Sequence, residues 1–196
     1  MPRRKVQFVQ GCYYHIYNRG AGRQSLFCDD EDYKRCLRTL KEVALVCQVV
    51  VIAYCLMPNH YHWLVRQDGE ISAGDLPKCV FGSYSQAFNL VHKRSGTLFE
   101  GRFKARLVSN DEYLRQLCRY IHANPVKDGF ALAPELWPYS NYQEWLGLRN
   151  GTLVDRTFIQ HFFPETQQYN AFVLDYLTGR ADLPSGVKVY LNNLWY

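Results

Sequence analysis

Two histidines one residue apart, at the start of the segment HYHWLVR (residues 60–66), are the first candidates for chemistry in this sequence. The segment is rich in strand formers, and residues i and i+2 of a strand face the same side. His60 and His62 therefore share a face, and their spacing suits two ligands to one metal ion. Tyr61 and Trp63 share the other, better core face, so we expect the imidazoles to point away from the apolar layer or at its polar edge. Two histidines do not close a metal site, and the alternative is a polar edge strand whose histidines have no function.

A second pair of candidates lies on the segment SNDEYLRQLCRYIHANP (residues 109–125), which has the clearest helical pattern in the sequence. Its apolar stripe follows the i, i+3, i+4, i+7 rule. Tyr120 falls about 110° from the centre of that stripe, and Asn124 lies one turn further on the same side. A tyrosine beside an amide offers a hydroxyl nucleophile and an oxygen ligand for a hard cation. His122 lies off the stripe and is expected at the surface, whereas His15 is expected to be structural.

The ends of this helix can also be predicted. Ser109 followed by Glu112 is a capping box, which places the start of the helix at Ser109. A proline disfavours helical geometry at the residue before it, so Pro125 places the end of the helix near Asn124.

Basic residues cluster before this helix. Arg102, Lys104 and Arg106 alternate in the segment LFEGRFKARLV (residues 98–108), so they form a basic stripe on one face of a predicted strand. A second basic patch comprises Arg3, Arg4 and Lys5. Both patches are candidates for contacts with the phosphates of a nucleic acid, and the alternative for the stripe is a solvated strand face.

The remaining pattern interleaves strands and helices. Strands are predicted at residues 12–20, 49–55, 60–66 and 97–108, and helices at residues 29–48, 82–92 and 109–125. Because the connection between residues 49–55 and 60–66 is a short turn, that pair is an antiparallel hairpin. We therefore expect an α+β fold, an antiparallel sheet with helices packed on it. Residues 1–129 form the predicted domain, and residues 130–196 are interpreted as its helical C-terminal extension.

Composition sets broad limits on the function. The chain has 196 residues and a net charge of +5, which permits a nucleic-acid partner without proving one. Its seven cysteines are odd in number and lack a CxxC motif, which indicates free thiols in a reducing compartment. Neither a signal peptide nor a membrane span is recognised, so we expect a soluble, cytoplasmic protein.

The segments MPNHYHWLV and YLRQLCRYIHANPVKDG together resemble the single-tyrosine HUH transposases, in particular the REP-associated tyrosine transposases. Three further segments fit that group in order and spacing: YHIYNRG (14–20), SLFCDDEDY (25–33) and LFEGRFKARLV (98–108). The resemblance covers about residues 11–145. It implies the ferredoxin-like HUH transposase fold.

The resemblance also implies a role for each candidate residue. His60 and His62 match the metal-binding pair, Asn124 the third metal ligand, and Tyr120 the nucleophile that forms a 5′-phosphotyrosine. The implied cofactor is Mg²⁺ or Mn²⁺, and the implied partner is single-stranded DNA with hairpins. The protein would act as a homodimer or as a monomer. Tyr61 departs from the smaller hydrophobic residue that is usual between the two histidines.

Three alternatives stay open from the sequence. The first is a non-catalytic protein that keeps the fold and binds hairpin DNA. The second is a metal-dependent phosphoesterase that uses water, and therefore forms no covalent adduct. The third is a relative of replication initiators or relaxases, which share the two-histidine strand but carry other ligands and additional domains.

Overall fold

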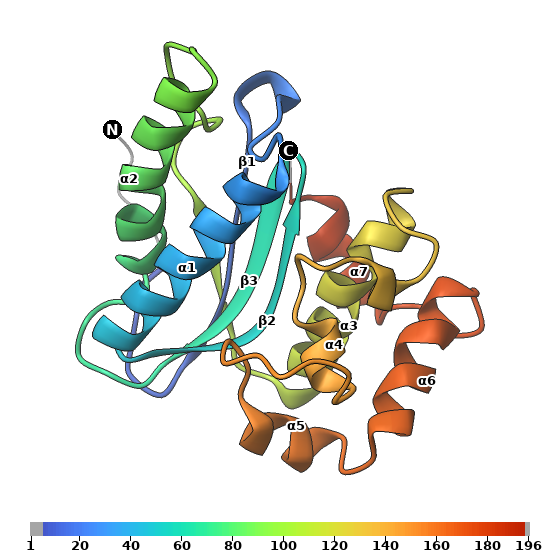
Figure 1. The fold of residues 1–196 in the computed structure, drawn as a ribbon. Helices are drawn as coiled ribbons and strands as arrows, with labels where there is room; N and C mark the ends of the chain where they lie inside the picture. The colour runs from blue at the N-terminus through green and yellow to red at the C-terminus, as the bar shows by residue number, and fades with distance from the viewer. Residues whose placement is uncertain (1–5, 195–196) are drawn as a thin grey trace.

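Four antiparallel strands form the central sheet (Figure 1) of the computed structural model, which describes residues 6–194. The strands are β1 (Tyr13–Arg19), β2 (Val49–Met57), β3 (His60–Gln67) and β4 (Lys104–Val108). Their order in the sheet is β2-β3-β1-β4. With one helix after β1 and one after β3, the chain follows the β-α-β-β-α-β order of the ferredoxin-like fold. The predicted α+β class with an antiparallel sheet is confirmed.

Helices α1 (Asp30–Val46) and α2 (Leu76–Val91) cover one face of the sheet. The side chain of Asp29 caps α1 by accepting a hydrogen bond from the backbone N–H of Asp32, at 3.0 Å. A first hydrophobic core fills the space between these helices and the sheet, with Leu40, Val80 and Trp63 fully buried in it. This core faces the Tyr61–Trp63 side of β3, as the alternation in the sequence predicts.

The opposite face of the sheet is covered by α3 (Asp111–Lys127) and by the helices that follow it (Figure 1). The helices that follow α3 are η2 (Pro134–Leu136), α4 (Tyr142–Trp145), α5 (Arg156–Phe162), α6 (Thr166–Leu177) and α7 (Ser185–Asn192). A further short helix, η1 (Ala21–Arg23), follows β1. A second hydrophobic core lies on this side, and Leu64, Ile121 and Trp145 are buried in it. Most of the described residues after 129 therefore pack on α3 and the sheet, although Tyr139 stacks on Tyr33 of α1. The predicted boundary at residue 129 stays a prediction.

Two predicted boundaries before α3 were wrong. Helix α2 begins at Leu76 instead of near Gly82, because Pro77 lies in the first turn, where its missing N–H costs no hydrogen bond. The strand predicted at residues 97–108 is shorter, since β4 begins only at Lys104. Gly101, with φ of 77°, turns the chain before it.

Both predicted ends of α3 were also wrong. Its cap is Asn110, whose side chain accepts a hydrogen bond from the backbone N–H of Tyr113 at 3.1 Å, and not Ser109. The helix continues through Pro125 to Lys127. Near the end of a helix, a proline removes only a single backbone hydrogen bond. The helix stops just before Gly129, whose φ of 77° is typical of a helix C-terminus.

Asn141 connects the C-terminal segment to the edge strand β2. Its buried amide accepts a hydrogen bond from the Tyr54 N–H at 2.8 Å and donates to the carbonyls of Ile52 and Leu153 at 2.9 and 3.0 Å. Asn141→Ala should lower the free energy of unfolding by about 2–4 kcal/mol, because it leaves buried polar groups unpaired. Chemical denaturation would measure the decrease, with the exposed Asn150→Ala as a matched control that should change little. Equal stability of the two variants would contradict this role.

The structure also bears on the cysteines and on membranes. Within the described residues all seven cysteines are free, and four of them, Cys36, Cys47, Cys55 and Cys118, are buried. Across residues 6–194, the helices are too short or too polar to span a bilayer.

Candidate active site

His60 and His62 lie at the start of β3, under α3 and the C-terminal helices. His62 is fully buried and His60 is 9% exposed, with the centroids of the two rings 5.1 Å apart. Both point away from the apolar layer that holds Tyr61 and Trp63, as expected, but the second core on their own face was not expected. A strand alternation shows which residues share a face, but it does not show that a later part of the chain covers that face.

Burial keeps both imidazoles neutral. Desolvation, with a smaller effect of the Arg19 charge, lowers the pKa of His60 to about 4. Desolvation also lowers the pKa of His62 well below its usual range, and His15 and His60 act in the same direction. Neutral imidazole is the form that binds metal ions, so neither ring has to lose a proton near neutral pH.

His62 is held by a residue of the neighbouring strand. Its Nδ1 lies 2.9 Å from Nε2 of the fully buried His15, and Nδ1 of His15 lies 2.8 Å from the hydroxyl of Tyr190 on α7. Such outer hydrogen bonds fix the orientation of a ligating ring. From the sequence, His15 was expected to have only a general structural role. Its place in β1, two residues before Tyr17, which pairs with His62, could have suggested this contact.

His60 faces a carboxylate that the sequence pattern did not single out. The Asn59 amide oxygen lies 2.8 Å from Nδ1 of His60, and since that oxygen only accepts, Nδ1 carries the proton. The other ring nitrogen, Nε2, then presents a lone pair to Oδ2 of Asp128, at 3.9 Å. Two acceptors that face each other favour a cation between them. Asp128 could have been found from its spacing, four residues after Asn124 at the end of α3.

Tyr120 and Asn124 lie on α3, facing the histidine pair. The Tyr120 ring packs edge-on against His62, with centroids 5.5 Å apart. Asn124 is 4% exposed, and its amide nitrogen has no hydrogen-bond partner among the described residues. Burial raises the pKa of the Tyr120 hydroxyl, and a hydrogen bond with Asn124 opposes that rise. The fold therefore brings all four residues of the predicted metal and nucleophile set into one place.

Two pockets meet at this point. One, of about 380 Å³, is lined by Tyr120, Asn124 and Asp128 together with residues of α6 and α7. The other, of about 400 Å³, is lined by His60 and Asp128 together with Arg19, Arg23, Asn59 and Phe130. Asp128 thus lies at the boundary between the nucleophile side and the histidine side, and two arginines line the latter.

The predicted DNA-binding residues are placed differently from the single stripe expected. Arg102, Lys104 and Arg106 are all exposed, but Arg102 precedes β4. Lys104 donates a hydrogen bond to the carbonyl of Leu194 at 2.7 Å, and the guanidinium of Arg106 lies 4.0 Å from the Tyr190 ring centroid. The second predicted patch, formed by Arg3, Arg4 and Lys5, lies outside the described residues.

His122 is not at the surface. It is fully buried, with Nε2 2.8 Å from the Asn141 amide oxygen and Nδ1 beside the hydroxyl of Tyr169. The prediction was wrong because α4 and α6 cover the side of α3 that lies off its apolar stripe. His122 therefore joins α3 to the C-terminal helices and takes no part in the site.

Comparison with known proteins identifies the family of the chain. The model of a protein family described as "Transposase IS200 like" matches residues 8–124, more than half of the chain. The chain belongs to this IS200-like transposase family. The resemblance to REP-associated tyrosine transposases is confirmed as well, through two relatives.

One relative is the Haemophilus influenzae protein described as a "Putative REP-associated tyrosine transposase". It is 28% identical over 106 residues, which is 46% of this chain and 57% of the relative, so the match spans little more than half of that protein's length. The other is the solved structure of a REP-associated tyrosine transposase bound to a REP hairpin. At a TM-score of 0.64 and 18% identity, it covers 79% of this chain and 94% of its own, which shows the shared IS200-like transposase fold.

Proposed function

We propose that this member of the IS200-like transposase family cleaves and rejoins single-stranded DNA near hairpins through a covalent bond to Tyr120. A divalent metal ion, Mg²⁺ or Mn²⁺, would assist. The observation that carries the proposal is the packing of Tyr120 against His62, with Asn124 one helical turn away. The solved structure of similar fold that holds a REP hairpin supports hairpin DNA as the substrate.

Tyr120 would do the chemistry. Its hydroxyl oxygen forms a bond to the scissile phosphorus as the bond to the 3′ oxygen breaks. The 5′ phosphate then stays on Tyr120 and the departing 3′ oxygen takes up a proton. Because the phosphotyrosine is still a phosphodiester, a 3′-OH can reverse the step on another strand without an external energy source.

The phenol proton needs an acceptor. Burial raises the pKa of Tyr120, so the hydroxyl is protonated near neutral pH. Asp128 lines the same pocket, and burial raises the pKa of its carboxyl above its usual range. A higher pKa makes a carboxylate a better base, and we assign the proton from Tyr120 to Asp128.

The residues present fit a divalent metal ion. His60 and His62 are neutral imidazoles, and Asn124 supplies a buried amide. Imidazole and oxygen donors together suit a divalent cation that keeps open positions for a phosphate. When bound, the ion would supply charge stabilisation at the scissile phosphate and the departing oxygen.

The test is a denaturing gel of the full chain with labelled hairpin DNA and Mg²⁺ or Mn²⁺. The proposal expects a shortened strand together with a protein–DNA adduct that survives denaturation. Cleavage without an adduct would favour the phosphoesterase that uses water. Hairpin binding without either product would favour the non-catalytic DNA-binding protein.

Arg102, Lys104 and Arg106 are proposed to bind phosphates of the DNA. Log affinity falls as log salt rises, and each phosphate interaction that is removed should reduce the magnitude of that slope by roughly 0.7–0.9. Substituting all three by Ala should therefore flatten the slope by about 2–3 units, with little change in the preference for one hairpin over another. Salt titrations of wild type and triple variant on the same hairpin measure this.

A matched control removes the same charge from helix α1. Lys34, Arg38 and Lys41 are exposed on α1, which covers the opposite face of the sheet. Their triple Ala variant should keep the wild-type slope. If both triple variants lower the slope equally, general charge is responsible and these positions do not mark the DNA path.

A further inference from the structure

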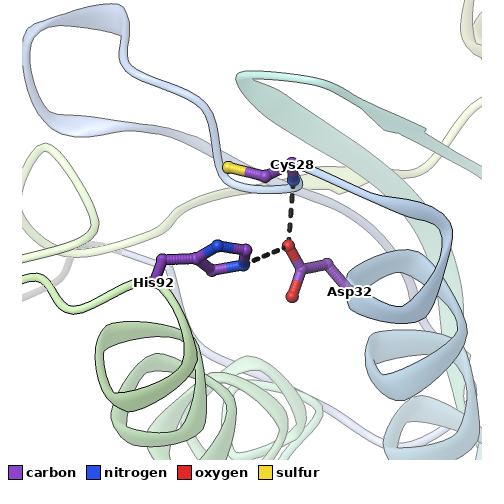
Figure 2. A group of neighbouring side chains, drawn as sticks. All are labelled: Cys28, Asp32 and His92. Carbon is purple, nitrogen blue, oxygen red and sulfur yellow. Dashed lines mark hydrogen bonds and ion pairs between the residues drawn. The ribbon is translucent and has the colours of Figure 1, made fainter.

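A second cluster of metal-ligating side chains lies where the start of α1 meets the end of α2 (Figure 2). Cys28 belongs to the loop before α1, Asp32 to the first turn of α1, and His92 directly follows α2. Their ligand atoms all lie within 4.8 Å of one another. Because α1 and α2 cover the face of the sheet opposite to α3, this cluster is separate from the His60–His62 pair.

Asp32 is at the centre of the cluster. Its Oδ2 lies 2.8 Å from Nε2 of His92 and accepts a hydrogen bond from the backbone N–H of Cys28 at 2.9 Å, as Figure 2 shows. The carboxylate is only 1% exposed, and Oδ1 has no hydrogen-bond partner among the described residues. The guanidinium of Arg35 approaches Oδ1 only to 3.6 Å, through Nη1. A buried carboxylate with one oxygen left without a hydrogen bond is costly, and a bound cation would offset that cost.

We propose that Cys28, Asp32 and His92 bind a zinc ion, with water in the fourth position. Thiolate, imidazole and carboxylate are the three side-chain donors that Zn²⁺ accepts together in tetrahedral sites. Mg²⁺ and Ca²⁺ are disfavoured because they take oxygen ligands. Asp29, the cap of α1, adds a further negative charge beside Cys28.

Small side-chain movements would complete the site. Zinc–ligand distances of about 2.0–2.3 Å place tetrahedral ligand atoms about 3.3–3.7 Å apart. The longest present separation would have to close by about 1 Å, whereas Nε2 of His92 and Oδ2 of Asp32, now 2.8 Å apart, would have to move about 0.5 Å apart. Cys28 is exposed and can rotate toward the other two residues. The hydrogen bond between His92 and Asp32 is replaced, as the imidazole proton moves to Nδ1 and Nε2 binds the ion.

The thiol proton is released to solvent on binding. Affinity for zinc should therefore rise with pH. Once bound, the ion would join α1 to α2 and stabilise that layer of the fold.

The experiment uses Co²⁺ as a spectroscopic probe for zinc in the full-length His60→Ala/His62→Ala variant, so that the histidine pair contributes no signal. Titration of the metal-free protein should give a thiolate-to-cobalt charge-transfer band that saturates near one ion per chain and disappears when Zn²⁺ is added. Added zinc should also raise the melting temperature.

Cys28→Ser and His92→Gln in the same background should each remove the band and the zinc-dependent rise in melting temperature. Cys79→Ser, at another exposed cysteine, should keep both. The proposal is overturned if the parent, shown by its melting transition to be folded, gives no band, or if the band survives Cys28→Ser. It is also overturned if Cys79→Ser removes the band. Each result is independent of DNA cleavage, so failure of the transposase mechanism would leave this test unaffected.

Discussion

Tyr120→Phe should abolish the covalent protein–DNA adduct and lower hairpin cleavage by at least about 10³-fold, while hairpin binding stays nearly unchanged. The substitution removes only the oxygen that attacks phosphorus. The ring keeps its edge-on packing against His62, so the local structure should persist. Single-turnover cleavage of labelled hairpin DNA, run beside a binding titration, measures both quantities on the same preparation.

Tyr113→Phe is the matched control, since Tyr113 lies two helical turns before Tyr120 on the same helix. Burial raises the pKa of Tyr113 to about 12, and its ring packs against Tyr190 on α7. We expect this variant to form the adduct at the wild-type rate. An adduct that persists in Tyr120→Phe and disappears in Tyr113→Phe would transfer the nucleophile to Tyr113.

The pairing of β2 with β3 follows from local patterns in the sequence, whereas β1 pairs with β3 and β4 across long stretches of chain. The β-branched run before residue 55, the turn Met57–Pro58–Asn59 and the returning strand from His60 are all within a short stretch, so the hairpin is encoded locally. The ends of the helices were harder to predict, because they depend on which of several weak signals prevails. Pro125, for example, does not end α3; the helix stops just before Gly129, whose left-handed conformation suits a C-terminus.

The candidate site was predictable only in part, for a physical reason. His60 and His62 share a strand face, and Tyr120 and Asn124 share a helix face. Each pair can therefore be predicted from the side-chain repeat of its element, two residues in a strand and 3.6 in a helix. Contacts between elements have no such period. The hydrogen bond between His15 and His62 joins residues 47 positions apart in the sequence, and the one between His15 and Tyr190 joins residues 175 positions apart.

The burial of His122 has the same origin. Its exposure was predicted from the face of a single helix, whereas Tyr169 and Asn141, from later segments, surround it. A residue off the apolar stripe of a helix is exposed only when nothing else packs there. In this protein the C-terminal helices form a second layer on α3, so polar residues on that side become buried and hydrogen-bonded.

His60→Ala and His62→Ala should each lower the rate of cleavage by about 10³-fold, the equivalent of several kcal/mol of charge stabilisation at the scissile phosphate. Chelation of divalent ions in the wild-type protein should have the same effect. Adding Mn²⁺ or Mg²⁺ back should restore the activity of the wild type, but should not restore that of the histidine variants. Asn124→Ala should cost less, because water can replace a neutral oxygen ligand. Rates measured over a range of metal concentrations separate weaker metal binding from impaired chemistry.

His161→Ala, at an exposed histidine of α5, is the control and should keep full activity. His62 is fully buried and hydrogen-bonded to His15, so the folding of His62→Ala should be checked by thermal unfolding and by hairpin binding. A folded variant that binds DNA but does not cleave it isolates the defect at the metal step. Full wild-type activity in excess chelator, or in both folded histidine variants, would instead exclude His60 and His62 as metal ligands, and Tyr120 would have to act with the charges of the protein alone.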